Sequence, residues 1–104
     1  MATNKLTGIL GMARRANRVS LGHDASLDAL KKSSGKLILL SCDASDRLKD
    51  EFKNACEEYR VKCITLEYTM NELGAGMGAK TTAVLSVNDE GFAKRINELI
   101  LEDD

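Results

Sequence analysis

Tryptophan and proline are absent from these 104 residues, and aromatic residues make up only 4% of the chain. Exposed aromatic rings carry the stacked bases in many single-strand-binding proteins, so we expect no base-stacking platform. No apolar run approaches the ~20 residues of a membrane-spanning helix, and the N-terminus lacks the basic-then-apolar pattern of a signal peptide. We therefore expect a cytoplasmic protein without a membrane segment.

Residues that hold metals or disulfides are also scarce. The chain has one histidine, His23, and three cysteines, Cys42, Cys56 and Cys63, which form no CxxC pair. The odd number argues against a disulfide framework, and a single histidine without a close cysteine pair does not have the spacing of a zinc site. We therefore expect no metal site, and we interpret the cysteines as free thiols that pack as small apolar residues.

Acidic and basic residues balance over the whole chain but not along it. The net charge is −1, yet residues 1–36 carry seven basic residues against two acidic ones, a net charge of +5, and the remainder carries −6. This asymmetry favours a polyanion-binding face on the first third of the chain. The alternative is a solvated helix face that happens to be basic. The seven basic residues are Lys5, Arg14, Arg15, Arg18, Lys31, Lys32 and Lys36.

Apolar periodicity predicts helices and strands in alternation. An uninterrupted apolar run lies within residues 36–41, which is typical of a central strand covered on both faces. Alternation of this kind, in one domain over residues 1–104, predicts a three-layer α/β/α sandwich. The expected helices are 4–16, 23–33, 46–59, a short one from residue 70 and a last one from about residue 90; the other expected strands are 18–21, 61–66 and 81–87.

Local signals predict where several helices begin and end. Asn17 is expected to stop the first helix in a left-handed conformation, and Gly35 is expected to stop the second. Thr69 and Glu72 have the spacing of a capping box that opens a short helix. The glycines that follow are expected to break this helix; they are Gly74, Gly76 and Gly78.

The junction at residues 19–26 is the strongest candidate for a binding site. A short apolar strand reaches Gly22 and turns at once into a helix, whose N-terminus exposes unpaired N–H groups and a partial positive charge. Basic residues flank this junction in the sequence on both sides. Together these features suit a phosphate backbone, and we interpret the junction as the edge at which the protein binds RNA.

A second stretch resembles a nucleotide-binding motif. Residues 74–81, with the sequence GAGMGAKT, differ from the phosphate-binding loop GxxxxGK[ST] only at Ala79. That loop needs a strand before it and a helix after it, whereas here a capped helix precedes and a strand follows. We therefore expect no nucleotide cofactor, and we interpret the stretch as a surface loop whose glycines allow close backbone approach to a partner.

No set of residues indicates catalysis. His23 has no evident acidic partner except its sequence neighbour Asp24, and neighbours along a helix do not face each other. The acidic residues Asp43, Asp46 and Asp50 are explained as helix-start residues. We therefore expect a protein that is not an enzyme.

An ordered set of segments resembles a known family. The segments are Ile9-Leu10-Gly11-Met12-Ala13-Arg14-Arg15-Ala16-Asn17, then Val19 and Gly22, then Lys36-Leu37-Ile38-Leu39-Leu40 with Asp43-Ala44-Ser45, then Leu73-Gly74 and Gly78, and finally Gly91-Phe92-Ala93. Their order and spacing resemble the kink-turn RNA-binding ribosomal proteins of the L-seven-Ae and L-thirty-e group, and within it the small bacterial YlxQ-like proteins. The resemblance covers nearly the whole chain.

The resemblance implies a four-stranded mixed sheet and a non-catalytic, cofactor-free protein that binds structured RNA, as a ribosomal or ribosome-associated protein. In the family, the N-terminus of the second helix reads sheared G·A pairs of a kinked duplex, and a loop before the last strand covers an extruded base. On this chain those places are residues 22–28 and 74–82. The candidate RNA-binding residues are Arg14, Arg15, Arg18, Gly22, His23, Asp24, Lys32, Gly74, Gly76, Gly78 and Lys80.

The chain departs from the family pattern at the second helix. Where RNA-binding members have an Asn-Glu pair and then a lysine, this chain has Asp24, Ala25 and Asp28. Ionised aspartate only accepts hydrogen bonds, and Asp28 puts an anion beside phosphates. Together the changes should weaken kink-turn binding by on the order of a few kcal/mol. The alternative function is a protein-interaction module of the same fold that no longer binds RNA, associated with ribosomal or transcription–translation proteins.

Overall fold

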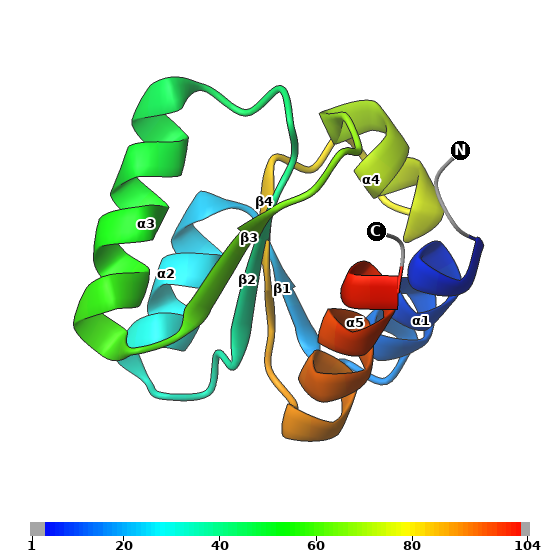
Figure 1. Cartoon of the computed structure of the whole chain (residues 1–104), viewed down its shortest axis with the longest axis horizontal. Helices are drawn as coiled ribbons and strands as arrows, with labels where there is room; N and C mark the ends of the chain where they lie inside the picture. The colour runs from blue at the N-terminus through cyan, green and yellow to red at the C-terminus, as the bar shows by residue number, and fades with distance from the viewer. Residues whose placement is uncertain (1–3, 103–104) are drawn as a thin grey trace.

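The computed structural model describes residues 4–102, in which five helices alternate with four strands (Figure 1). This is the order that the apolar pattern predicts. None of the helices within these residues has the length together with the apolar character that crossing a membrane requires. The elements are α1 (Asn4–Arg15), β1 (Val19–Leu21), α2 (His23–Lys31), β2 (Leu37–Leu40), α3 (Asp46–Tyr59), β3 (Lys62–Thr65), α4 (Met70–Gly76), β4 (Val84–Val87) and α5 (Glu90–Glu102).

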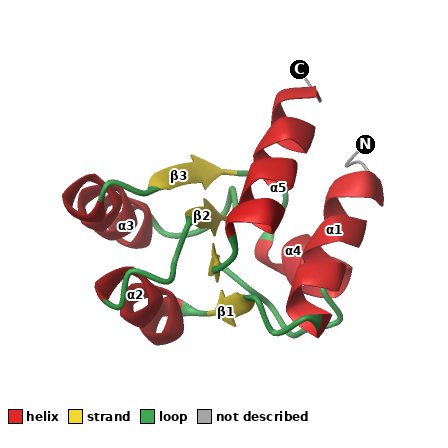
Figure 2. Ribbon diagram, turned by 90° about the horizontal axis from the view of Figure 1, so that it is seen from below, coloured by secondary structure: helices red, strands yellow, loops and turns green. Residues whose placement is uncertain are grey.

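The four strands form one mixed sheet in the order β1-β4-β2-β3. β2 and β3 are parallel, whereas β4 runs antiparallel to both of its neighbours. Helices α2 and α3 cover one face, and α1, α4 and α5 cover the other (Figure 2). Every residue of the central strands β2 and β4 is buried. The three-layer α/β/α sandwich with a four-stranded mixed sheet is therefore confirmed.

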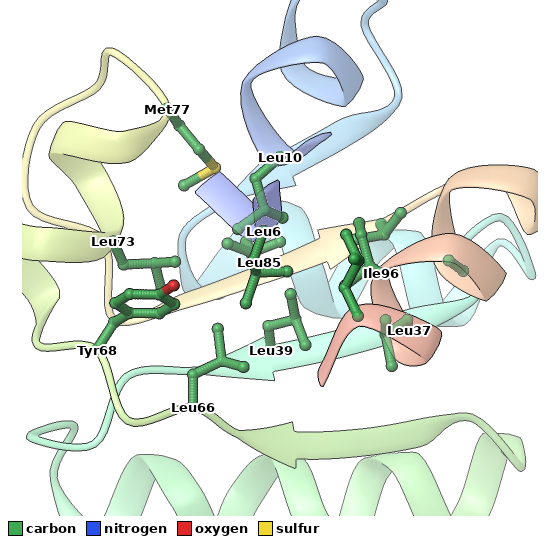
Figure 3. Close-up of a cluster of buried hydrophobic side chains, with 13 residues drawn as sticks. Leu6, Leu10, Leu37, Leu39, Leu66, Tyr68, Leu73, Met77, Leu85 and Ile96 are labelled. Atoms are coloured by element: carbon green, nitrogen blue, oxygen red, sulfur yellow. The ribbon is translucent and has the colours of Figure 1, made fainter. Parts of the chain in front are cut away.

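The two cores follow from the alternation of side chains along a strand. Leu37 and Leu39 of β2 and Leu85 of β4 point toward α1, α4 and α5 (Figure 3). The alternate residues of β2, Ile38 and Leu40, point to the other face, toward α2 and α3. The second core contains Leu30, Ile38, Leu40, Phe52, Cys56 and Val84.

Two predicted helix ends have different outcomes. Asn17 has φ of 61° and ends α1 in the left-handed conformation, as predicted. The prediction for α2 is wrong, because Ser33, with φ of 62°, takes the left-handed position instead of Gly35. Gly35 is buried, and a Cβ there would lie 2.7 Å from Ser86 Oγ. Its small size therefore serves packing between α2 and β4.

The capping box of α4 is confirmed, and the predicted break by glycines is correct for Gly76 and Gly78 but wrong for Gly74. Thr69 and Glu72 cap each other's backbone N–H groups. The helix then runs on through Gly74 to Gly76, and the chain turns at Gly78, where φ is 68°. A capped turn and tight packing against neighbouring chain segments hold this glycine-containing helix together. As expected from the sequence, a strand and not a helix follows this stretch.

Candidate nucleic-acid interface

Gly22 joins β1 directly to α2. Its φ of 93° and ψ of 173° fall in a region that is essentially restricted to glycine. Its N–H donates to the carbonyl oxygen of Val84 at 2.9 Å, and its own carbonyl oxygen accepts the N–H of Ser26 at 3.0 Å. Gly22 therefore completes the strand pairing on one side and begins the helix on the other.

The N-terminus of α2 differs from those of α3 and α4 because it has no side-chain cap. In α3, Ser45 Oγ accepts the N–H of Leu48 at 3.1 Å, and in α4 Thr69 and Glu72 form the capping box. Gly22 supplies no side chain, and no side-chain hydrogen bond caps α2. The first N–H groups of α2 therefore remain available to a ligand, where the helix dipole favours negative charge.

The fold places the loop before β4, residues 77–83, beside this helix start. Because β4 is antiparallel to both β1 and β2, its first residues lie next to the ends of those strands. The Gly22–Val84 hydrogen bond joins the two sides, and Ser41 N–H donates to the carbonyl oxygen of Ala83 at 2.9 Å. The two places, far apart in sequence, therefore form one edge of the sheet.

Only part of the glycine-rich segment lies in this loop. Gly78 and Lys80 belong to the loop itself, and Gly78 is exposed there. Gly74 is buried inside α4, and Gly76 is half-buried against Thr7 of α1. The close backbone approach that these last two glycines allow is therefore made to the protein itself.

Two of the predicted arginines lie beside the same loop. Arg14 donates from Nη1 to the carbonyl oxygen of Met77 at 3.3 Å. The guanidinium of the exposed Arg15 lies next to Gly11, which faces the carbonyl oxygen of Gly76. These cations flank the loop on the side of α1.

The remaining predicted cations lie toward the opposite edge of the sheet. The carbonyl oxygen of Arg18 accepts the N–H of Asn88 at 2.8 Å, just beyond the end of β4. Lys32 follows the last residue of α2, about 15 Å along the helix axis from Gly22 at ~1.5 Å per residue, and pairs with Asp28 at 2.9 Å. The basic residues that flank Gly22 in the sequence are therefore divided between two edges.

His23 has an acidic partner that the sequence did not indicate. Its Nε2 lies 2.8 Å from Glu51 Oε2 on α3, and its Nδ1 lies 2.7 Å from Asp24 Oδ1. The ring also packs edge-on against Phe52, with centroids 5.7 Å apart. The expectation that His23 has no acidic partner except Asp24 is therefore wrong. No local signal could find Glu51, since the contact depends on how α2 packs against α3.

The two carboxylates change both the protonation of His23 and the charge of the edge. The hydrogen bond with Asp24, followed by that with Glu51, raises the pKa of His23 above its usual 6.5. A protonated ring can donate from both nitrogens at once. The start of α2 therefore has carboxylates on the α3 side and cations on the α1 side.

Protonation of His23 should contribute a small, pH-dependent stabilisation. Because its pKa is higher in the folded protein, the stabilisation is complete below the unfolded pKa and is lost as pH rises through the folded pKa. The side chain is 43% exposed, so screening limits the contribution to about 0–1 kcal/mol. Urea denaturation of the wild type and His23→Gln should give a stability difference that falls as the pH is raised above about 6.5, the ordinary pKa of histidine. A pH-independent difference would contradict these ion pairs.

Comparisons with known proteins find the same kind of relative by sequence and by fold. The sequence model described as the ribosomal protein L7Ae/L30e/S12e/Gadd45 family matches residues 4–97. The RNA-binding protein YlxQ of Bacillus subtilis (strain 168) is 32% identical over 92 residues, 88% of this chain and 91% of that protein. The protein of the same name from Enterococcus faecium is 29% identical over 96 residues, 92% of this chain and 91% of that protein.

Two solved structures share the fold. A protein with unknown function from Bacillus halodurans C superimposes with a TM-score of 0.88 at 26% identity, over 94% of this chain and 98% of that one. The Giardia lamblia 15.5kD RNA binding protein gives a TM-score of 0.76, over 98% of this chain and 90% of that one. At 17% identity, the second likeness concerns the fold alone.

Proposed function

Because this chain belongs to the ribosomal protein L7Ae/L30e/S12e/Gadd45 family, we propose that it binds structured RNA without catalysing a reaction. The binding edge consists of the start of α2 and the loop at residues 77–83. The observation that carries this proposal is the uncapped helix N-terminus at Gly22, joined to the loop by the Gly22–Val84 hydrogen bond. The names of the YlxQ relatives support RNA as the ligand.

The proposed contacts divide into two kinds. Arg14, Arg15 and Lys80 neutralise phosphates and set the orientation of the RNA, whereas backbone N–H groups at the start of α2 and polar atoms of His23 and Asp24 meet base edges. Arg18 and Lys32 are assigned to phosphates farther along the RNA, because they lie toward the other edge of the sheet. We further propose that the RNA is kinked, as in ribosomal RNA kink-turns.

Binding to a kink-turn RNA and to a straight duplex of equal length, across a salt series, tests this function. We expect the kinked RNA to bind more tightly at every salt concentration. Equal and steeply salt-dependent binding to both RNAs would contradict the kink-turn specificity but leave a basic RNA-binding face. No binding to either RNA would contradict RNA binding itself.

Charge reversal at the loop should weaken RNA binding more than charge reversal elsewhere. We expect Arg14→Glu and Lys80→Glu each to lower affinity about ten-fold and to reduce the salt slope by about 0.9 for each phosphate that is no longer neutralised. Lys94→Glu, at an exposed position of α5, is the matched control and should bind like the wild type. Thermal unfolding of all three variants checks the fold. Equal losses at the loop and at Lys94 would exclude the proposed edge.

A protein partner is the second candidate, favoured by the carboxylates at the start of α2. Asp24 is fully exposed, and Glu51 lies across from it on His23. These groups repel phosphates and suit a basic protein surface, such as that of a ribosomal or transcription–translation protein. Retention on heparin at low salt discriminates the two functions, since a protein that no longer binds polyanions should pass through the column.

A further inference from the structure

Two cysteines line one pocket on the far side of the molecule from α1. The pocket has a volume of about 670 Å³ and lies between the C-terminal part of α3 and the start of β3. Cys56, on α3, is buried, and Cys63, on β3, is partly buried. Lys53 and Arg60 line the same pocket, together with one carboxylate, Glu57. The charged side chains of this pocket therefore carry a net positive charge beside two thiols.

The two thiols pack in the same core cluster and are not equivalent. The Cys56 thiol donates a hydrogen bond to the sulfur of Cys63. This hydrogen bond lowers the pKa of Cys63, to which the positive charge of Lys53 also contributes, and burial acts in the opposite direction. The contact with Cys63 and burial both raise the pKa of Cys56. Cys63 is therefore the better nucleophile of the pair, because the thiolate is the reactive form.

We propose that Cys63 and Cys56 form a thiol–disulfide exchange site for an anionic low-molecular-weight disulfide. Cys63 is the attacking thiol and Cys56 is the resolving thiol. The positive charge at Lys53 and Arg60 attracts the anionic ligand, and the pocket gives it access to Cys63. The site is independent of the RNA-binding edge, because it lies at the opposite end of β3 from the loop that leads to α4.

With glutathione disulfide as the ligand, the exchange proceeds in two balanced steps. The Cys63 sulfur attacks one sulfur of the ligand, the ligand's disulfide bond breaks, and the first glutathione leaves as a thiol with the proton that Cys63 lost. Cys56 then loses its proton and attacks the Cys63 sulfur, which releases the second glutathione thiol. Two electrons pass from the cysteine pair to the ligand, and a Cys56–Cys63 disulfide forms.

The chain connection favours closure of this disulfide. Cys56 and Cys63 are separated by the last turn of α3 and a tight turn in which Arg60, with φ of 57°, is left-handed. Both side chains pack in the same core cluster and line the same pocket, so bond formation requires them to rotate into disulfide geometry. Cys42 is exposed in the segment between β2 and α3 and does not line the pocket.

Intact mass spectrometry of the reduced, full-length protein with glutathione disulfide tests the proposal. Cys42→Ser should lose two hydrogen atoms and yield a Cys56–Cys63 linked peptide. With Cys42→Ser also present, Cys56→Ser should instead retain one glutathione, on Cys63. Cys63→Ser should react at least about ten-fold more slowly at Cys56 than the wild-type pair. Circular dichroism verifies that each variant is folded.

The charge of the ligand provides a second, independent readout. Lys53→Gln should slow the reaction of the Cys42→Ser protein with anionic glutathione disulfide and should leave its reaction with the cationic disulfide cystamine equal or faster. The proposal is wrong if Cys56 in the Cys63→Ser variant reacts with glutathione disulfide as fast as the wild-type pair does. It is also wrong if folded Cys56→Ser acquires no glutathione on Cys63. Equal slowing of both ligands by Lys53→Gln would also overturn the assigned ligand class.

Discussion

Replacement of Gly74 by alanine should lower the free energy of unfolding by about 3 kcal/mol. A Cβ at this position would lie 1.9 Å from the carbonyl oxygen of Lys80 and 2.7 Å from its carbonyl carbon. Both are backbone atoms, which cannot rotate away as the end of a side chain can. Either α4 or the loop before β4 must therefore move, and the hydrogen bond from Ala79 N–H to the carbonyl oxygen of Gly74, 2.8 Å long, is broken or distorted.

Urea denaturation followed by far-ultraviolet circular dichroism measures this effect, and Gly8 provides the matched control. Gly8 lies in α1, where an added Cβ would meet nothing within 4 Å. Gly8→Ala should therefore stabilise the protein by up to about 1 kcal/mol, through helix propensity alone. The packing explanation would fail if both variants changed stability by the same amount and in the same direction.

A large loss of stability in Gly74→Ala would also explain why this stretch of the chain is rich in glycine. Gly74 faces the backbone of Lys80, and Gly76 faces the side chain of Thr7, where a Cβ would lie 2.9 Å from Cγ2. Both glycines therefore allow the protein to pack against itself. Since their small size sets the position of the loop, Gly74→Ala should weaken RNA binding as well as stability.

The layers of the fold were predictable because they depend on local patterns. The four buried residues of β2 form a continuous apolar run in the sequence, and such a run has few structural explanations. The capping box at Thr69 and Glu72 involves residues three positions apart. The continuation of α4 through Gly74 was not predictable, because the partners that require Gly74 and Gly76 belong to other segments of the chain.

The candidate site was predictable only in part, for the same reason. Gly22 is recognisable because its role is local, as the turn between a strand and a helix. The meeting of Gly22 with the start of β4 depends on the order of strands in the sheet. Arg18 lies close to Gly22 in sequence but near the other edge, because β1 separates them. Glu51 reaches His23 only through the packing of α2 against α3.

Restoring the family residues at the second helix should strengthen binding to a kink-turn RNA by about 100-fold, roughly 3 kcal/mol. The variant is Asp24→Asn, Ala25→Glu and Asp28→Lys. Asparagine can both donate and accept at a base edge, whereas aspartate only accepts. Lysine at position 28 replaces an anion by a cation beside the RNA. The cost to the stability of the fold is small. The variant loses the exposed Asp28–Lys32 ion pair and places two lysines one helical turn apart, which together cost about 0.5 kcal/mol.

Specificity is measured as the ratio of affinities for the kink-turn RNA and a straight duplex, because added positive charge alone strengthens binding to both. The triple variant raises the net charge by two, and Glu58→Lys, at an exposed position of α3, raises it equally. We expect the ratio to rise for the triple variant and to stay unchanged for Glu58→Lys. If both variants gain affinity while neither changes the ratio, the edge binds RNA as a polyelectrolyte and residues 24–28 do not read the kink. A raised ratio would instead show that the helix start and the loop already have the geometry for kinked RNA, and that Asp24, Ala25 and Asp28 set its affinity.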